Sequence, residues 1–313
     1  MHQTLVHGIV NNDHGSISKA LTIIENDLPE RSSLLKDIQE HSAKSLRIGI
    51  TGPPGAGKST LTDLLIDLFL EHDKTVGVIA VDPTSPFTGG SLLGDRVRMN
   101  NYAWNDNVYM RSMGSNGDLG GLAKRSQELG DVLSASGKDY ILFETVGVGQ
   151  SEHDIVKAAD ICVVVLVPES GDEIQMMKAG LIEIGDIFVI NKSDRDGANR
   201  LSSALKNILH YSSNHEQLDP LILNTIGTEK NGVKELYNGL LSYLDKMMKS
   251  GHLNNRRKDR YRQRVLDCVR EKLENNFWTE DKREILETST LEIENISKAP
   301  HIMAEDLLAR STK

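Results

Sequence analysis

The chain has 313 residues, of which 38% are hydrophobic, 26% are charged and 4% are aromatic. This composition is typical of a folded globular protein and excludes a disordered one. Its 36 basic and 45 acidic side chains give a net charge of −9, which disfavours general binding to nucleic acid or to anionic lipid. With two cysteines, Cys162 and Cys268, the chain has neither a disulfide framework nor a cysteine-rich zinc site.

No apolar run approaches the roughly 20 residues that a membrane-spanning helix needs. The first twelve residues lack a basic stretch followed by an apolar core, so no secretory signal is expected. We therefore expect no membrane association and a reducing compartment, the cytoplasm.

Residues 1–44 predict a polar helical extension. Apolar side chains recur at helical spacing on both sides of Pro29. The expectation is two short amphipathic helices that pack on a larger core.

Residues 45–248 alternate short apolar runs with amphipathic stretches, which predicts an α/β fold with a mostly parallel sheet covered by helices on both faces. The expected strands are Leu46–Thr51, Val76–Val81, Tyr140–Phe143, Ile161–Val167, Ile187–Ile190 and Leu221–Leu223. The expected helices include Ser59–Glu71, Leu122–Ala135, Gln175–Ile184 and Arg200–Tyr211.

Residues 249–313 show no strand pattern and predict a C-terminal helical arm. A basic run, Arg256–Arg264, is followed by a mostly acidic segment over residues 271–296. An apolar stripe at helical spacing starts at Val265 and ends at Phe277 and Trp278.

A phosphate-binding loop follows the first expected strand. Its sequence is Gly52-Pro53-Pro54-Gly55-Ala56-Gly57-Lys58-Ser59, followed by Thr60 at the start of a helix. Glycines let backbone N–H groups converge on phosphate oxygens, and the helix N-terminus adds partial positive charge. The pattern predicts that Lys58 reaches the β- and γ-phosphates and that the Ser59 hydroxyl ligates Mg²⁺. The fold class is therefore a P-loop NTPase.

A second motif, Asn191-Lys192-Ser193-Asp194, follows the strand Ile187–Ile190. The Asp194 carboxylate can accept hydrogen bonds from N1–H and the N2 amine of guanine, and adenine offers neither. Discrimination against ATP of about 10⁴-fold follows from leaving that carboxylate unpaired. The predicted nucleotide is GTP or GDP, bound through Asn191, Lys192 and Asp194.

Carboxylates at strand ends are candidates for the metal site. Asp82 and Glu144 each follow an expected strand beside the phosphate loop, and Asp95 lies in a glycine-rich segment. Ligands bind at this edge of open α/β sheets, although each carboxylate also fits a helix cap or a solvated turn. Glu144-x-x-Gly147 stands where many GTPases have Asp-x-x-Gly, so Gly147 is expected to sense the γ-phosphate.

The residue that orients the attacking water in Ras-like enzymes is a glutamine directly after the switch glycine. Val148 holds that place here, and Gln150 is near but offset. We expect slow intrinsic hydrolysis that a partner stimulates. The candidate catalytic residues are Lys58, Glu144, Gly147 and Gln150.

These motifs together closely resemble the MeaB/ArgK family of GTPases associated with methylmalonyl-CoA mutase. The resemblance is carried by Gly52–Ser59, Val81–Pro86, Thr88–Arg96, Leu119–Ala123, Glu144–Glu152 and Asn191–Asp194. One departure is Asn224-Thr225-Ile226-Gly227, where the family commonly has a Ser-Ala turn behind the guanine.

The resemblance implies a homodimeric GTPase chaperone of an adenosylcobalamin-dependent acyl-CoA mutase, which gates cofactor loading and protects or reactivates the mutase. It implies metal-site roles for Ser59, Asp82, Asp95 and Glu144. It implies a further switch at Gly171–Lys178, in which Asp172 and Lys178 couple the nucleotide to the mutase. The C-terminal segment is similar to the family's dimerisation arm, and its basic and acidic parts either pair within or between chains or form solvated faces.

Three other functions are compatible with a P-loop. A metal-delivery GTPase needs a Cys or His cluster, whereas Cys162 lies in an apolar run and His2, His7 and His14 are irregularly spaced. A kinase or ATPase tied to amino-acid transport conflicts with the guanine motif. A nucleic-acid-binding GTPase using Arg256–Arg264 conflicts with the net acidity.

Overall fold

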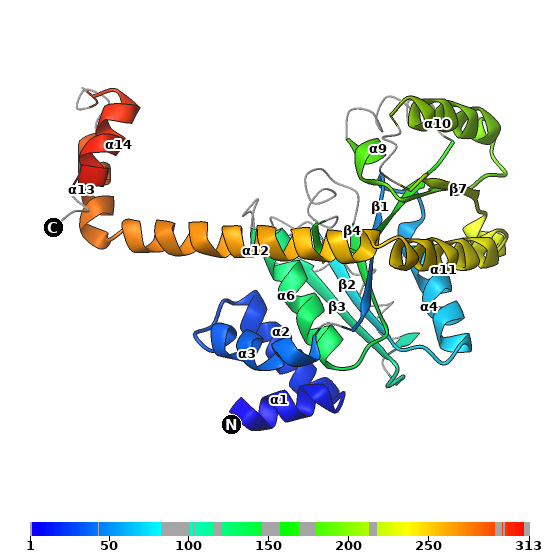
Figure 1. Ribbon diagram of the computed structural model, residues 1–313, viewed down its shortest axis with the longest axis horizontal. Coiled ribbons are helices and arrows are strands. Elements are labelled where there is room, and N and C mark those ends of the chain that lie inside the picture. The colour runs from blue at the N-terminus through cyan, green and yellow to red at the C-terminus, as the bar shows by residue number, and fades with distance from the viewer. Residues whose placement is uncertain are drawn as a thin grey trace. The chain divides into compact units, whose positions relative to one another are not determined.

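The computed structural model describes residues 2–42, 44–82, 101–102, 104–114, 121–145, 157–168, 180–212, 218–291, 296 and 298–309 (Figure 1). Within these ranges, seven strands form one parallel sheet in the order β3-β2-β4-β1-β5-β6-β7. The strands are β1 (Leu46–Thr51), β2 (Val76–Asp82), β3 (Val108–Gly114), β4 (Tyr140–Thr145), β5 (Ile161–Leu166), β6 (Ile187–Ile190) and β7 (Leu221–Asn224). The predicted mostly parallel sheet is confirmed.

Each expected strand is present: β1 and β6 have the predicted bounds, and each of the other four differs from the prediction at one end by one or two residues. The sequence did not predict β3, which lies at the edge of the sheet. Its run includes Arg111. The guanidinium of Arg111 pairs with the carboxylate of Glu25, at the end of an N-terminal helix, so the charge within the strand has a partner. An edge strand with such a polar residue lacks the continuous apolar run that marks a central strand.

The helices alternate with the strands and then continue alone to the C-terminus. They are α1 (His2–Val10), α2 (His14–Glu25), α3 (Arg31–Ile38), α4 (Lys58–Glu71), α6 (Gly121–Ala135), α9 (Leu181–Ile184), α10 (Ala198–Ser212), α11 (Val233–Lys249), α12 (His252–Phe277), α13 (Glu280–Thr290) and α14 (Pro300–Ala309), with short 3₁₀ turns η1 (Gln39–His41) and η2 (Gly227–Glu229).

Two helix predictions need correction. The N-terminal extension contains α1 in addition to the two expected helices. The expected helix Gln175–Ile184 is not continuous, because Gly180 has a left-handed φ of 63° and α9 begins only after it. Residues 175–179 lie outside the described ranges.

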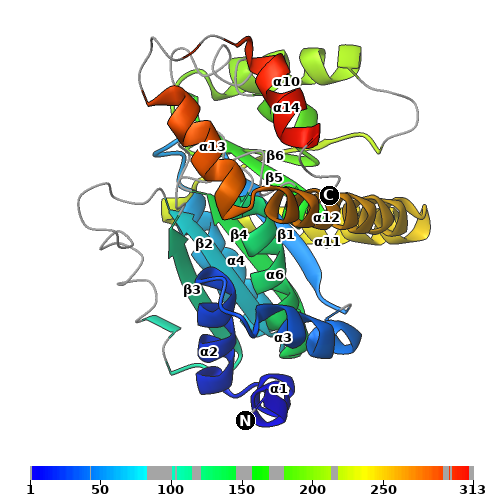
Figure 2. The ribbon, with the colours of Figure 1, turned by 90° about the vertical axis from the view of Figure 1, so that its left-hand side faces the viewer.

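Alternating side chains of the strands point to opposite faces of the sheet, and each face is covered. On one face, Ile48 and Val163 pack with α4 and α11. On the other, Phe143 packs with α6 and the N-terminal helices, and Val164 packs near α10. Figure 2 shows α6 lying across the sheet with α2 and α3 beside it. Because these helices lie on the two faces of the sheet, we expect a site at the carboxyl ends of the strands.

The chain divides into two compact units, residues 1–257 and 258–313. The second unit holds most of α12 together with α13 and α14. Lys282 is buried there with its Nζ 3.9 Å from the centre of the Phe277 ring, and Leu307 is buried as well. On α12 itself, Val265, Leu266 and Leu273 are exposed apolar side chains.

Candidate nucleotide-binding site

The site forms around the turn from β1 into α4, at the centre of the sheet. The sheet order places β1 between β4 and β5, where the chain switches from building one side of the sheet to building the other. Ligands of open α/β folds bind outside the carboxyl ends of the strands at such a point. All the candidate residues on β1, β4, β6 and β7 therefore converge at one edge.

The loop after β1 has the backbone that a phosphate cradle requires. Gly52, Gly55 and Gly57 have φ values of 136°, 72° and 88°. A Cβ on Gly52 would lie 2.0 Å from the Val165 carbonyl oxygen of β5, and one on Gly57 would lie 2.3 Å from Asn191 Nδ2. These positions therefore require glycine for close approach as well as for their φ angles.

Lys58 begins α4 and is buried, with its side chain folded back over the loop. Its Nζ donates to the carbonyl oxygens of Gly52 and Pro53 at 2.7 and 2.9 Å. An ammonium group held at the mouth of the loop, next to the N-terminus of a 14-residue helix, favours a polyphosphate anion.

Ser59 and Glu144 meet across the two neighbouring strand ends. The Ser59 Oγ donates a hydrogen bond to Glu144 Oε1, and the Glu144 side chain is buried at the end of β4. A hydroxyl and a carboxylate are the oxygen donors that Mg²⁺ prefers, so this pair fits a magnesium ion. Asp82 ends β2, two strands from β1, and only its backbone is described.

The guanine motif is tied directly to the phosphate loop. Asn191 is 3% exposed, and its Nδ2 donates to the Ala56 carbonyl at 2.8 Å. The Nζ of Lys192 donates to the Gly55 carbonyl at 2.8 Å. The backbone of Lys192 is itself left-handed, with a φ of 55°. Asp194 is exposed at the same turn, open to a ligand. The two motifs, more than 130 residues apart in the chain, thus form one surface.

The turn after β7 holds the asparagine from its other side. The Thr225 Oγ1 and the Gly227 N–H donate to Asn191 Oδ1 at 3.0 and 3.1 Å, and the Ser193 N–H donates to the Thr225 carbonyl at 3.1 Å. In the sequence, this turn is noted only as a departure from the Ser-Ala turn that is common in the family that the motifs resemble. Its structural role was missed because a Thr-Ile-Gly turn carries no pattern of its own.

Several predicted site residues lie outside the described residues: Asp95, Gly147, Gln150, Asp172 and Lys178. Cys162 is buried in β5, where burial raises the pKa of its thiol, so this sulfur behaves as a small apolar group. No helix in the described part of the chain is both long and apolar enough to cross a bilayer.

The fold and the loop after β1 together define a P-loop NTPase. Comparison with known proteins gives the family. The chain belongs to the MeaB family, because the family model for the methylmalonyl Co-A mutase-associated GTPase MeaB matches residues 17–282. The resemblance seen in the sequence motifs is thereby confirmed.

Relatives in all three domains of life match over most of this length. A Pyrococcus abyssi protein provisionally named as a GTPase is 43% identical over 272 residues, 86% of this chain and 84% of that protein. The mouse methylmalonic aciduria type A homolog, a mitochondrial protein, is 33% identical over 88% of this chain and 71% of its own. Among solved structures, one described as an LAO/AO transport system kinase matches with a TM-score of 0.74 and 25% identity, covering 100% of this chain and 98% of that chain.

Proposed function

We propose that this chain binds and hydrolyses GTP and acts as a chaperone for an adenosylcobalamin-dependent acyl-CoA mutase, gating cofactor loading and protecting or reactivating the mutase. Membership of a family described as mutase-associated supports the partner class. The observation that carries the nucleotide assignment is the bond from Asn191 Nδ2 to the Ala56 carbonyl, which joins base recognition to phosphate binding.

Each group of the proposed site has a task in the reaction. The loop Gly52–Ser59 and Thr60 orient the triphosphate, and Lys58 neutralises the charge that develops on the β- and γ-phosphates. Asn191, Lys192 and Asp194 hold the guanine. Mg²⁺, held by Ser59 with Glu144, Asp82 and Asp95 directly or through water, supplies further charge neutralisation when bound. Gly147 and Gln150 are proposed to sense the γ-phosphate and to lie near the attacking water.

We propose slow intrinsic turnover, because Val148 stands where a water-orienting glutamine is found in Ras-like enzymes. Asp172 and Lys178 are proposed to transmit the nucleotide state to the mutase. Only a difference in the mutase's affinity for the two nucleotide states can carry that signal. Substituting Asp172 or Lys178 should leave GTP affinity unchanged and remove the effect of GTP on mutase binding.

The proposed arrangement in the cytoplasm is a homodimer formed through residues 249–313. Three apolar side chains on α12 support a protein contact, since Val265, Leu266 and Leu273 are 44%, 50% and 64% exposed. Such a stripe along a long helix is typical of a helix that packs against another chain.

The test of function combines nucleotide binding with mutase binding. Calorimetry should give saturable GTP and GDP binding and at least a hundredfold weaker ATP binding. An acyl-CoA mutase should then co-purify to different extents with the GDP-bound chain and with the chain bound to a non-hydrolysable GTP analogue. Equal affinity for ATP and GTP would instead favour the alternative function, a kinase or ATPase tied to transport, which matches the description of the solved structure as a transport system kinase.

A further inference from the structure

Two aspartates at the starts of central strands lock the sheet together at the edge opposite the nucleotide site. Asp160 precedes β5 and is fully buried. Its N–H donates to the Arg47 carbonyl of β1 at 2.7 Å, and its Oδ2 accepts from the Arg47 N–H at 3.1 Å. Asp160 therefore fixes the start of β5 against β1 through both backbone and side chain.

Asp186 does the same for the next strands. Its N–H donates to the Cys162 carbonyl of β5 at 2.9 Å, and its Oδ2 accepts from the Cys162 N–H at 2.8 Å. Its own carbonyl accepts from the Leu221 N–H of β7 at 3.0 Å. The start of β6 is thereby fixed to both of its neighbours.

The first turns of α12 bring two arginines to these aspartates. Arg257 forks onto Asp160, with Nη2 2.7 Å from Oδ2 and Nε 3.2 Å from Oδ1, and also donates to the Ser45 carbonyl. Arg256 forks onto Asp186, with Nη1 2.7 Å from Oδ2 and Nη2 2.9 Å from Oδ1. Leu253, three and four residues earlier on the same helix face, is buried in the core.

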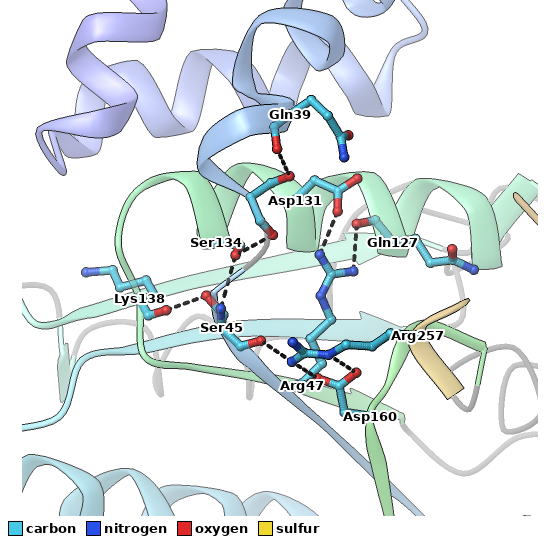
Figure 3. A network of polar contacts seen from close by, with 10 residues as sticks. Gln39, Ser45, Arg47, Gln127, Asp131, Ser134, Lys138, Asp160 and Arg257 are labelled. Carbon is cyan, nitrogen blue, oxygen red and sulfur yellow. Dashed lines mark hydrogen bonds and ion pairs between the residues drawn. The ribbon is translucent and has the colours of Figure 1, made fainter. Parts of the chain in front are cut away.

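Figure 3 shows the Arg257 half of this arrangement: the guanidinium lies between the Asp160 carboxylate and the Ser45 carbonyl, and the Arg47 side chain turns the other way to Asp131 of α6. We name the four residues Asp160, Asp186, Arg256 and Arg257 the arginine clamp. Bidentate arginine–carboxylate pairs fix direction as well as distance, so the clamp sets the positions of the strand starts.

The strands joined by the clamp, β1, β5, β6 and β7, are those whose other ends contact or carry the guanine-binding surface. β1 leads into the phosphate loop, and the Val165 carbonyl of β5 faces Gly52. β6 ends at Asn191, and β7 leads into the turn that holds Asn191 through Thr225. By contrast, β2 and β4, which end at the candidate metal carboxylates, lie on the other side of β1.

We infer that Arg256 and Arg257 are positioning residues for the guanine nucleotide: through the arginine clamp, the start of α12 holds the strands that bring the phosphate loop and Asn191 together. This inference rests on the proposed binding of GTP and GDP. The strands are short and lie in a close-packed sheet, so a displacement at one end is carried to the other. Releasing the clamp loosens the hydrogen bonds around Asn191 and shortens the lifetime of bound nucleotide.

The experiment measures the dissociation rate of fluorescent GDP from wild type and from the double variant Arg256→Gln/Arg257→Gln. A rise of about tenfold is expected, because affinity changes within one site appear mostly in dissociation. Hydrolysis at saturating GTP should change less than the dissociation rate, because a saturating concentration of GTP offsets faster loss of bound nucleotide. The single variants Arg256→Lys and Arg257→Lys keep the charge without the fork and should give intermediate rates.

The matched control is Arg111→Gln, which removes a similarly half-buried arginine from an ion pair with Glu25 at the β3 edge of the sheet. It should lower Tm by a similar amount without changing GDP dissociation. If the double variant does not fold, the two lysine variants are judged by the same comparison with Arg111→Lys. The inference is overturned if GDP dissociation speeds up in the control variant as much as in the clamp variants for the same loss of Tm. A wild type that binds no GDP refutes the proposed function instead.

Discussion

Replacing Gly52 by alanine tests whether the phosphate loop depends on close backbone contact with β5. The new Cβ would lie 2.0 Å from the Val165 carbonyl oxygen, and the residue would keep a φ of 136°. Left-handed strain costs about 1–2 kcal/mol, and overpacking against backbone that belongs to a central strand adds about 1–3 kcal/mol. A total near 3 kcal/mol corresponds to a drop in Tm of roughly 6–12 °C for a domain of this size.

The control is Gly137→Ala at the opposite edge of the sheet. Gly137 has a φ of 80°, and a Cβ there meets nothing within 4 Å. Gly137→Ala should lower the free energy of unfolding only by the cost of left-handed strain, about 1–2 kcal/mol. Thermal unfolding and titration with fluorescent GDP are measured for both variants and for wild type. We expect GDP affinity to fall by at least tenfold for Gly52→Ala and to stay unchanged for Gly137→Ala.

The close contact between Gly52 and β5 would have no effect if Gly52→Ala and Gly137→Ala had the same Tm and both bound GDP like wild type, and this outcome refutes the prediction. That result would mean that the loop and β5 separate without cost. A lower Tm with unchanged GDP affinity would show that the contact stabilises the sheet but does not shape the cradle.

Three further predictions follow from the described contacts. Asn191→Ala removes three hydrogen bonds, each worth about 1–3 kcal/mol when a buried partner is left unpaired, so calorimetry should show at least a hundredfold loss of GDP affinity; native affinity would contradict the site. Burial lowers the pKa of Lys138 to about 8 from 10.5, so the unfolded chain binds this proton more tightly and stability rises as pH increases between 8 and 10.5. The free energy of unfolding in urea should therefore rise by about 2 kcal/mol more for wild type than for Lys138→Met between pH 7.5 and 9.5, and parallel curves would disprove this. Val269→Glu with Leu273→Glu should convert the proposed dimer to a monomer by light scattering while Asn275→Glu, off the stripe, does not; a dimer in both cases would exclude this stripe as the interface.

Local features of the sequence were sufficient for the class of fold and for the two nucleotide motifs. Runs such as Ile161–Leu166 are apolar throughout because a central parallel strand is buried on both faces. The phosphate loop is contiguous in the chain, and its glycines mark the backbone turn by themselves. Contiguous motifs and strongly periodic segments can be read without knowledge of what packs against them.

The tertiary structure alone decided which distant residues support those motifs. Nothing local marks Thr225 and Gly227 as partners of Asn191, or Arg256 and Arg257 as partners of Asp186 and Asp160, because each hydrogen bond joins segments that only the strand order brings together. The basic run looked uniform in the sequence, yet its first two arginines face core carboxylates. Side-chain partners are set by the packing of whole elements, and a single sequence records composition and spacing but no distances between elements.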